Sequence, residues 1–306
     1  MMSASPKYAD WIAVDWGTSR LRAWAMQGVD TVLSYASSDD GMGTLTQPKF
    51  EPALLRLIEP WLGAGHINVV ACGMVGSRQG WAEAAYVPVP CKPGLARLHP
   101  VLTLDPRISL SILPGVSQAN PPDVMRGEET QIAGFLHKFP NFDGVLCLPG
   151  THTKWVHLSA AEIVSFQTFM TGEMFALLAT QSVLRHSVDP DHHTPDLFLE
   201  AVSDSLSRPE RIAQRLFSLR ANGLLNGPDP QAARARLSGS LIGLELAGAR
   251  PYWLGQQVAI AGTPALAALY ETALAAQGVP VECYAADDLT RAGLASAYAS
   301  LTEIAV

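Results

Sequence analysis

The stretch VDWGTSRLRAW, residues 14–24, sets an acidic side chain, a glycine and two hydroxyl groups between two apolar, strand-like segments. The successive N–H groups of a tight turn form a concavity that binds anions. A carboxylate beside it, here Asp15, suits a divalent metal ion that accompanies phosphate groups. The stretch therefore predicts a phosphate-binding hairpin, with a plain β-hairpin carrying a polar turn as the alternative.

The second half of the chain repeats this arrangement after the apolar run GVLCLPG, residues 144–150. A single Gly-Thr dipeptide carries no information, but two at the same place in two similar halves indicate a duplicated α/β domain. Such a duplication would direct a hairpin from each half toward a shared cleft that holds a polyphosphate. Two unrelated hairpins are the alternative. The turns that align are Gly17, Thr18, Ser19 and Arg20 in the first half and Gly150, Thr151, His152 and Thr153 in the second.

Composition limits the classes of protein to which the chain can belong. Its 306 residues suffice for two domains, and 48% apolar against 16% charged residues is typical of an ordinary globular protein. The formal net charge of −7 gives no basis for nucleic-acid binding. No apolar run approaches the roughly 18 residues that span a bilayer, and MMSASPKYAD lacks the apolar segment of a signal peptide. We expect a cytoplasmic protein with no nucleic-acid or membrane partner.

Apolar periodicity divides the chain into two halves that each begin with strands. The Gly- and Pro-punctuated residues 76–107 predict an irregular functional insertion. PNFDG, residues 140–144, interrupts the pattern, so we expect an N-terminal domain over residues 1–139 and a C-terminal domain over residues 140–306. Strands are expected at 11–17, 20–26, 31–37, 67–74, 108–115, 144–150, 151–158, 162–169, 256–262 and 279–286, and helices at 52–62, 127–138, 172–187, 195–206, 210–220, 231–249, 263–277 and 288–303.

Three segments resemble the nucleotide motifs of the actin, hexokinase and Hsp70 superfamily. DWGTSRLRAW is similar to its first phosphate motif, LPGTHTKWV to its second, and VAIAGTPALAALY to the Gly-rich adenosine turn between a strand and a helix. More narrowly, the chain is identified as a member of the 2-dehydro-3-deoxygalactonokinase family. The motifs of that family occur in order over nearly the whole chain as GMVGSRQGW, VMRGEETQ, LPGTHTKWV, FMTGEM and LSGSLIGLEL.

The resemblance implies both a fold and an activity. The fold is α/β, a two-domain actin-like ATPase (ribonuclease H-like, duplicated) with an active-site cleft between the lobes. The activity is transfer of the γ-phosphoryl group of ATP, with Mg²⁺, to the terminal hydroxyl of 2-dehydro-3-deoxy-D-galactonate, which gives the 6-phosphate in galactonate catabolism. The N-terminal lobe would bind the sugar acid and the C-terminal lobe the adenosine. The partner is this small molecule, and a homodimer is compatible with the sequence.

The resemblance also suggests catalytic residues. Sugar kinases of the superfamily place an aspartate at the start of the helix that closes the first domain, and here Glu129 stands at that position as the candidate base. Glu128 is a competitor, because exopolyphosphatases of the same superfamily carry a similar Gly-x-Glu-Glu. For both glutamates, the structural alternative is a first-turn acidic residue favoured by the helix dipole. Asp15 would bind Mg²⁺, and Gly262 and Thr263 would contact the adenosine.

The carboxylate of the substrate should meet a cation that kinases of neutral sugars lack. Our first choice is Arg126, which could instead pair with the neighbouring glutamates. Arg78 in GMVGSRQGW is the second choice, and Ser77 and Trp81 of the same segment are further candidates for binding the sugar acid.

Two other classes of function fit parts of the sequence. A polyphosphate or nucleotide hydrolase on the same fold would share the Gly-Glu-Glu, but it would consume ATP without a sugar acid. A sugar-sensing repressor would need a DNA-binding helix-turn-helix, for which the roughly ten residues before the first strand leave no room. The kinase is the favoured interpretation.

Overall fold

The computed structural model describes residues 8–94, 97–188 and 194–304. The chain folds into two compact units, each with its own sheet and hydrophobic core. Unit 1 comprises Met1–Phe142, Ser159–Ser165 and Ala286–Val306, and unit 2 comprises Asp143–Leu158 and Phe166–Ala285.

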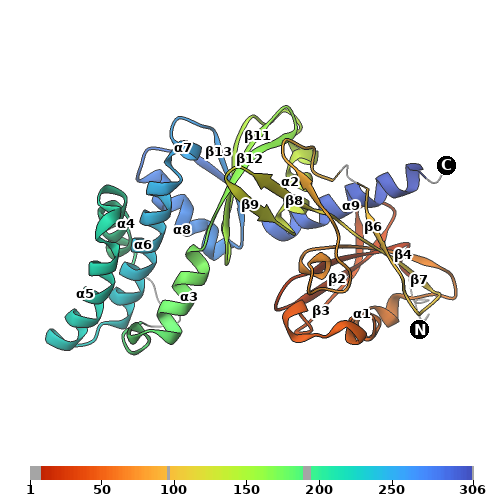
Figure 1. The fold of residues 1–306 in the computed structure, drawn as a ribbon, viewed down its shortest axis with the longest axis horizontal. Helices are drawn as coiled ribbons and strands as arrows, with labels where there is room; N and C mark the ends of the chain where they lie inside the picture. The colour runs from red at the N-terminus through yellow and green to blue at the C-terminus, as the bar shows by residue number, and fades with distance from the viewer. Residues whose placement is uncertain (1–7, 95–96, 189–193, 305–306) are drawn as a thin grey trace, which may run out of the picture. The chain divides into compact units, whose positions relative to one another are not determined.

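Unit 1 is built on a six-stranded sheet (Figure 1). Its strands are β1 (Trp11–Trp16), β2 (Leu21–Gln27), β3 (Thr31–Ser38), β4 (Ile67–Cys72), β6 (His99–Val101) and β7 (Ile108–Ile112). They lie in the order β3-β2-β1-β4-β7-β6. β1, β2 and β3 form an antiparallel meander, whereas β4 pairs in parallel with both β1 and β7.

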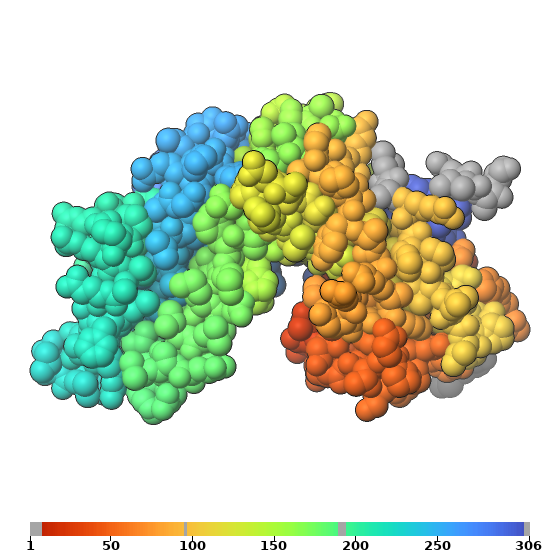
Figure 2. Space-filling view, viewed as in Figure 1, coloured from red at the N-terminus to blue at the C-terminus, as the bar shows by residue number. Residues whose placement is uncertain are grey.

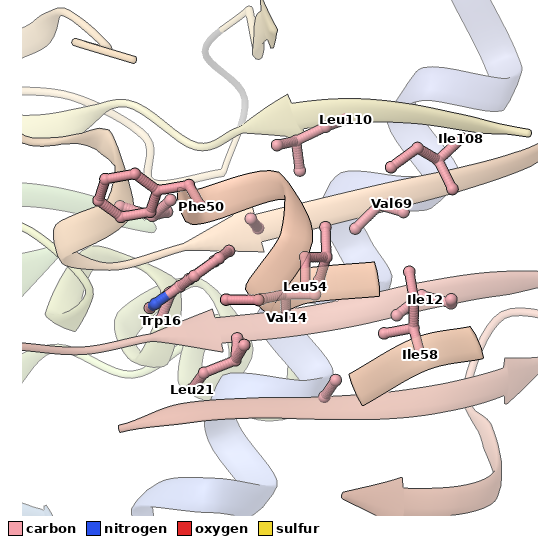
Figure 3. Packing of buried hydrophobic residues seen from close by; sticks show 14 of the residues in the cluster. Ile12, Val14, Trp16, Leu21, Phe50, Leu54, Ile58, Val69, Ile108 and Leu110 are labelled. Atoms are coloured by element: carbon pink, nitrogen blue, oxygen red, sulfur yellow. The ribbon is translucent and has the colours of Figure 1, made fainter. Parts of the chain in front are cut away.

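One face of this sheet packs on α1 (Phe50–Ile58). Successive strand residues point to opposite faces, so every second residue of β1 lies on this side. The helix presents residues four positions apart to the same layer. Burying each large apolar side chain contributes about 1.5–3 kcal/mol, so this layer supplies much of the stability of the unit. Figure 3 shows Ile12, Val14 and Trp16 of β1 beside Phe50, Leu54 and Ile58 of α1.

The other face packs on α9 (Ala286–Ile304), which lies beside α2 (Glu128–Lys138) (Figure 1). The backbones of the two helices approach each other very closely. A Cβ on Gly134 would lie 2.0 Å from the carbonyl oxygen of Leu289, and a Cβ on Gly293 would lie 2.0 Å from that of Thr130. Glycine is therefore required on both helices for this contact.

The helix α9 joins unit 1 although it follows all of unit 2 in the chain. Our sequence-based division counted residues 286–306 with the C-terminal half. The side chains of Leu294 and Ala295 pack in one core cluster with Trp11 and Val70 of the first sheet. This packing makes α9 part of unit 1. The break between the two halves falls after Phe142, inside PNFDG.

A small three-stranded sheet also belongs to unit 1, formed by β5 (Tyr86–Pro88), β8 (Gly115–Ala119) and β9 (Pro122–Met125). β5 pairs with β8 in parallel, and β8 pairs with β9 in antiparallel. The sheet reaches the surface, where its orange and yellow segments are both visible (Figure 2). We predicted neither these strands nor β6. The prediction was wrong because strands of three to five residues are too short to show an alternating apolar pattern.

Unit 2 repeats the topology of unit 1. The strands of its sheet are β10 (Gly144–Leu148), β11 (Thr153–Ser159), β12 (Glu162–Phe169), β13 (Val258–Gly262) and β14 (Val281–Ala285). Ser159–Ser165, which end β11 and begin β12, are counted with unit 1. Their order is β12-β11-β10-β13-β14, which matches β3-β2-β1-β4-β7 position by position. β10 pairs in antiparallel with β11 and in parallel with β13, just as β1 pairs with β2 and β4. The repeated order confirms the predicted duplication and the predicted actin-like α/β fold.

The helices of unit 2 are α3 (Thr171–Gln181), α4 (Pro195–Ser207), α5 (Ile212–Leu225), α6 (Pro230–Gly248), α7 (Arg250–Trp253) and α8 (Pro264–Ala275), with α4 and α5 packed on α6 (Figure 1). Two helices end four or more residues before the predicted position. α1 stops at Ile58 because Pro60 has no N–H to continue the helical ladder. α3 stops at Gln181, since the extended Ser182 caps the next 3₁₀ turn instead. In the described part of the chain, no helix combines the length and apolar character that a membrane span requires.

We predict that Gly134→Ala destabilises the protein although alanine is the better helix former. Helix propensity alone would favour alanine by about 1 kcal/mol. The new methyl group must push the backbone of α9 away, and overpacking of this kind costs about 1–3 kcal/mol. The midpoint of thermal unfolding should therefore fall. Gly65→Ala is the matched control, because a Cβ there has no atom within 4 Å. Equal midpoints for the two variants would contradict the close helix contact.

Candidate active site

The predicted first phosphate turn, Gly17 to Arg20, is held by a backbone clamp, by which we mean main-chain hydrogen bonds and a close glycine contact from a neighbouring segment. The Gly17 N–H donates to the Arg20 carbonyl across the turn at 2.9 Å. The segment that follows β3 then packs on it, with the Met42 N–H donating to the Gly17 carbonyl at 2.9 Å. Gly41 approaches so closely that a Cβ would lie 2.2 Å from the carbonyl carbon of Ser19. The turn is thus held by its backbone, which leaves its exposed side chains free for a ligand.

The second turn has the same kind of clamp at the same point in the fold. The first turn of α3, which follows β12, packs on it. A Cβ on Gly172 would lie 2.3 Å from the Gly150 carbonyl oxygen, and the Glu173 N–H donates to the Thr151 carbonyl at 2.9 Å. The Glu173 carboxylate also pairs with His152 Nε2 at 2.6 Å. The sequence indicated both turns but not the backbone contacts that hold them.

A buried carboxylate lies beneath the second turn. Glu245 of α6 is 2% exposed and accepts hydrogen bonds from Trp155 Nε1 and from the Tyr270 hydroxyl, both at 2.8 Å. The Tyr270 and Thr153 hydroxyl oxygens lie 3.0 Å apart, and Thr171 also bonds to the carboxylate. Burial raises the pKa of Glu245, and these hydrogen bonds oppose the rise. The Thr153 hydroxyl therefore points into unit 2 and ties the turn to α6 and α8.

The carboxylate predicted to bind a metal, Asp15, lies at the end of β1 in contact with Arg22. Arg22 also pairs with Asp287 in the first turn of α9. Burial raises the pKa of Asp15, and the positive charge of Arg22 partly offsets this effect. No group of three metal-ligating side chains occurs within the described residues. Asp287 could not be anticipated, because nothing near it in the sequence points to β1.

The two glutamates open α2, and both side chains fold back onto the helix start. The Glu129 side chain accepts the Gly127 N–H at 2.6 Å and the Thr130 hydroxyl at 3.2 Å, and the residue is 3% exposed. The Glu128 carboxylate accepts the Arg126 N–H at 3.1 Å. Burial and the negative charge of Glu128 raise the pKa of Glu129 to about 8. Both carboxylates bond backbone N–H groups near the start of α2. This agrees in part with the structural alternative to a catalytic role, in which both glutamates stabilise the start of the helix.

Two glycines bring these acidic groups close together. Gly73 follows β4 with a φ of +92°, and a Cβ there would lie 3.4 Å from Asp15 Oδ1. A Cβ on Gly127 would in turn lie 3.4 Å from the Gly73 Cα. The charge of Glu128 accordingly raises the pKa of both Asp15 and Glu129. Unit 1 therefore brings the carboxyl group of Asp15, at the end of β1, near those of Glu128 and Glu129 at the start of α2, with Gly73 after β4 between them.

Arg126 is buried beside these carboxyl groups, yet most of its guanidinium is unpaired. Nη2 donates to the Ala84 carbonyl at 2.7 Å, and the Tyr86 ring centroid lies 4.3 Å from Cζ. Across the described residues, the buried side-chain polar atoms without a partner are Nε and Nη1 of Arg126 and Oγ of Ser77. An unsatisfied buried donor costs about 1–3 kcal/mol. Such atoms are available to bind a ligand. Nε and Nη1 of Arg126 do not bond the neighbouring glutamates, the alternative that the sequence left open.

The other predicted substrate residues lie in different surroundings. Arg78 is exposed. Trp81 is half-buried and packs its ring on those of Trp16 and Phe50, at centroid distances of 6.1 and 6.3 Å. Its side chain therefore contributes to the core of unit 1.

A cavity of about 140 Å³ opens beside the second phosphate turn within unit 2. Gly262 and Thr263 do not line it, but they end β13 and begin α8, one wall of the cavity. A Cβ on Gly262 would lie 3.6 Å from Pro149, next to the turn. The lining residues are Gly150, Thr171, Gly172 and Phe175, then Arg234, Ser238, Leu241 and Ile242 of α6, and Leu266, Leu269 and Tyr270 of α8.

Comparison with known proteins gives consistent matches along the chain. The family model described as 2-keto-3-deoxy-galactonokinase matches residues 15–297. A protein of Rhizobium meliloti (strain 1021), assigned as a 2-dehydro-3-deoxygalactonokinase, is 40% identical over 293 residues, 93% of this chain and 95% of that one. The 2-dehydro-3-deoxygalactonokinase of Escherichia coli (strain K12) is 35% identical over 292 residues, covering 94% and 97%. A crystal structure of a protein from Sinorhizobium meliloti with the same assignment superposes with a TM-score of 0.87 at 39% identity, covering 94% and 95%.

We predict that Glu129 makes stability depend on pH. Between its ordinary pKa of 4.5 and about 8, the folded state keeps a proton that the unfolded state has released. Stability contributed by this group is therefore lost as the pH rises through that window. Glu129→Gln has no proton to lose, so its free energy of unfolding should rise relative to wild type between pH 4.5 and 8. Denaturant unfolding at a series of pH values measures the difference, and parallel curves would contradict the raised pKa.

Proposed function

The chain belongs to the 2-keto-3-deoxy-galactonokinase family, and on that premise we propose that it transfers the γ-phosphoryl group of ATP to the terminal hydroxyl of 2-dehydro-3-deoxy-D-galactonate. The product is the 6-phosphate, formed in galactonate catabolism. One structural observation supports the proposal that the substrate is an acid. Unit 1 buries the Arg126 guanidinium and the Ser77 hydroxyl, and Nε and Nη1 of Arg126 and Oγ of Ser77 have no partner. A carboxylate is the ligand that complements an unpaired guanidinium.

Glu129 is the proposed base that accepts the proton of the terminal hydroxyl. Phosphoryl transfer asks the protein mainly to position the reactants and to neutralise phosphate oxygens, with one group for that proton. A base is most effective when its pKa lies near the working pH, because it then combines high proton affinity with a substantial ionised fraction. The pKa of about 8 at Glu129 meets this condition. Glu128, one residue away and half-buried, remains the alternative.

The proposed phosphate ligands are the N–H groups of the two turns and the exposed hydroxyls of Thr18, Ser19 and Thr151, whereas Thr153, whose hydroxyl is bound inside unit 2, would contribute through its backbone. Arg20 adds a positive charge, and its ion pair with Asp39 is long at 3.7 Å and exposed, so a phosphate can compete for it. The cavity beside the second turn is the proposed adenosine site, with Gly262 and Thr263 at the start of its α8 wall. The phosphate residues are Gly17, Thr18, Ser19 and Arg20 in unit 1, and Gly150, Thr151, His152 and Thr153 in unit 2.

Asp15 is the proposed residue for Mg²⁺, directly or through a water molecule. Mg²⁺ usually keeps several waters and takes one or two carboxylates together with substrate phosphates, so a single aspartate near a phosphate turn suits it. The ion would neutralise charge on the phosphate oxygens. Arg22 holds the Asp15 carboxylate in place beside the first turn. A cytoplasmic location and a homodimer stay predictions from the sequence.

We expect ADP release to depend on the sugar acid. With ATP and Mg²⁺, a coupled assay should show ADP formation only when 2-dehydro-3-deoxygalactonate is present, and mass spectrometry should detect its monophosphate. Other 2-keto-3-deoxy acids in the same assay define the substrate range. Equal ADP release with and without any sugar acid would show a hydrolase instead.

Glu129→Gln should lower kcat by about 10²–10⁴-fold, the usual effect of losing a general base. Binding of ATP, measured by calorimetry, should change little because Glu129 does not belong to either phosphate turn. Glu128→Gln is the matched variant, since it removes the adjacent carboxylate at the same helix start. A large loss in Glu128→Gln with normal turnover in Glu129→Gln would move the base by one residue.

Arg126→Met should raise KM for the sugar acid by about 10- to 150-fold, because a hydrogen bond to a charged group is worth about 1.5–3 kcal/mol. KM for ATP should stay near the wild-type value. Arg78→Met is the parallel variant, as the exposed alternative for the same role. If Arg126→Met reduces kcat and leaves KM for the sugar acid unchanged, then Arg126 does not bind the carboxylate.

A further inference from the structure

We propose that Tyr86 is a positioning residue for sugar-acid recognition, because its ring holds the Arg126 guanidinium in the orientation that receives the carboxylate. The inference rests on the proposed function and adds to it a residue that no sequence motif identified. Tyr86 opens β5, the first strand of the small surface sheet of unit 1.

The Tyr86 ring contacts both the cation and the sheet. Its centroid lies 4.3 Å from the Arg126 Cζ, within the range of a cation–π contact. The ring also lies against the backbone of Gly115, where a Cβ would be 2.7 Å from the Tyr86 Cε1 atom. Tyr86 and Gly115 are register partners in the β5–β8 pair, so the sheet itself fixes the ring. The missing side chain at Gly115 makes room for it.

Two atoms of the guanidinium lie close to backbone. Nη2 donates to the Ala84 carbonyl, two residues before Tyr86. A Cβ on Gly76 would lie 2.9 Å from Nη1, so the loop next to Ser77 covers that end of the group. These contacts orient the cation without neutralising its charge, and Nε and Nη1 stay unpaired. A buried charge held in this way is preorganised for an anion, because the arginine side chain loses little conformational entropy when the anion binds.

The position of Tyr86 argues against a purely structural role. The residue is 40% exposed, which is high for a large aromatic side chain that stabilises a core. Its flat face meets a flat cation, and an aliphatic side chain could not reproduce that electrostatic attraction. The geometry therefore assigns the ring to Arg126 rather than to the hydrophobic core.

The test compares Tyr86→Phe, which keeps the ring, with Tyr86→Leu, which removes it. Tyr86→Leu should raise KM for the sugar acid about 3- to 30-fold, the range expected for losing a cation–π contact. KM for ATP should not change, and Tyr86→Phe should stay within about 3-fold of wild type. In the Arg126→Met background, Tyr86→Leu should have no further effect, because the group that it positions is gone.

Replacement of Tyr86 by pentafluorophenylalanine gives a readout that a structural role would not move. The fluorinated ring has nearly the same shape as phenylalanine but an opposite quadrupole, so it should raise KM for the sugar acid relative to Tyr86→Phe. Equal KM values for the two aromatic replacements would overturn the proposal. So would an unchanged KM in Tyr86→Leu, or an additive loss in the Arg126→Met background. If wild-type protein phosphorylates no 2-keto-3-deoxy acid, the proposed function fails, and this outcome is distinct from a failure of the Tyr86 variants alone.

Discussion

A backbone can approach another backbone to contact distance only where no Cβ lies between them, and both phosphate turns depend on such an approach. Gly41 presses on the first turn and Gly172 on the second. Each glycine follows the third strand of its sheet, so the duplication extends beyond strand order to the contact that fixes each turn. Because main-chain atoms make these contacts, the side chains of Thr18, Ser19 and Arg20 in the first turn stay exposed, whereas His152 and Thr153 also bind protein groups in the second. The same constraint brings α2 against α9, and with it the glutamates that open α2.

The charged groups of unit 1 are arranged in two different ways. Asp15 has a cation in contact, Arg22, which is itself shared with an aspartate on α9. Glu129 is bonded by neutral donors, the Gly127 N–H and the Thr130 hydroxyl, and its pKa is about 8. Burial raises the pKa of both carboxyl groups; at Asp15 the contact with Arg22 opposes this rise and favours the charged form that a cation would bind, whereas Glu129 is bonded by neutral donors and can exchange a proton near neutral pH. The surroundings of the two residues thus match the different roles proposed for them.

The sequence predicted much of this architecture because the decisive signals are local. Apolar runs, glycine turns and helix starts identified the longer strands of both large sheets, the two Gly-Thr turns and the position of Glu129 at the start of α2. It could not predict Arg22 meeting Asp287 or Thr153 meeting Tyr270, since those partners are more than a hundred residues apart. The β5–β8–β9 sheet was missed for another reason. Its strands are short and partly exposed, and the contact of the Tyr86 ring with Arg126 depends on a pairing between β5 and β8 that no local pattern indicates.

The position of α9 in unit 1 determines the order in which the two hydrophobic cores can be completed during synthesis. A ribosome adds about 5–20 residues per second and releases the N-terminal segments first. The sheet of unit 1 emerges early, but Trp11 and Val70 share a core cluster with Leu294 of α9. That helix is made only after every strand and helix of unit 2. The sheet face that carries Trp11 therefore cannot be covered by α9 until unit 2 has been synthesised. Unit 1, which is synthesised first, is the last of the two units to complete its hydrophobic core.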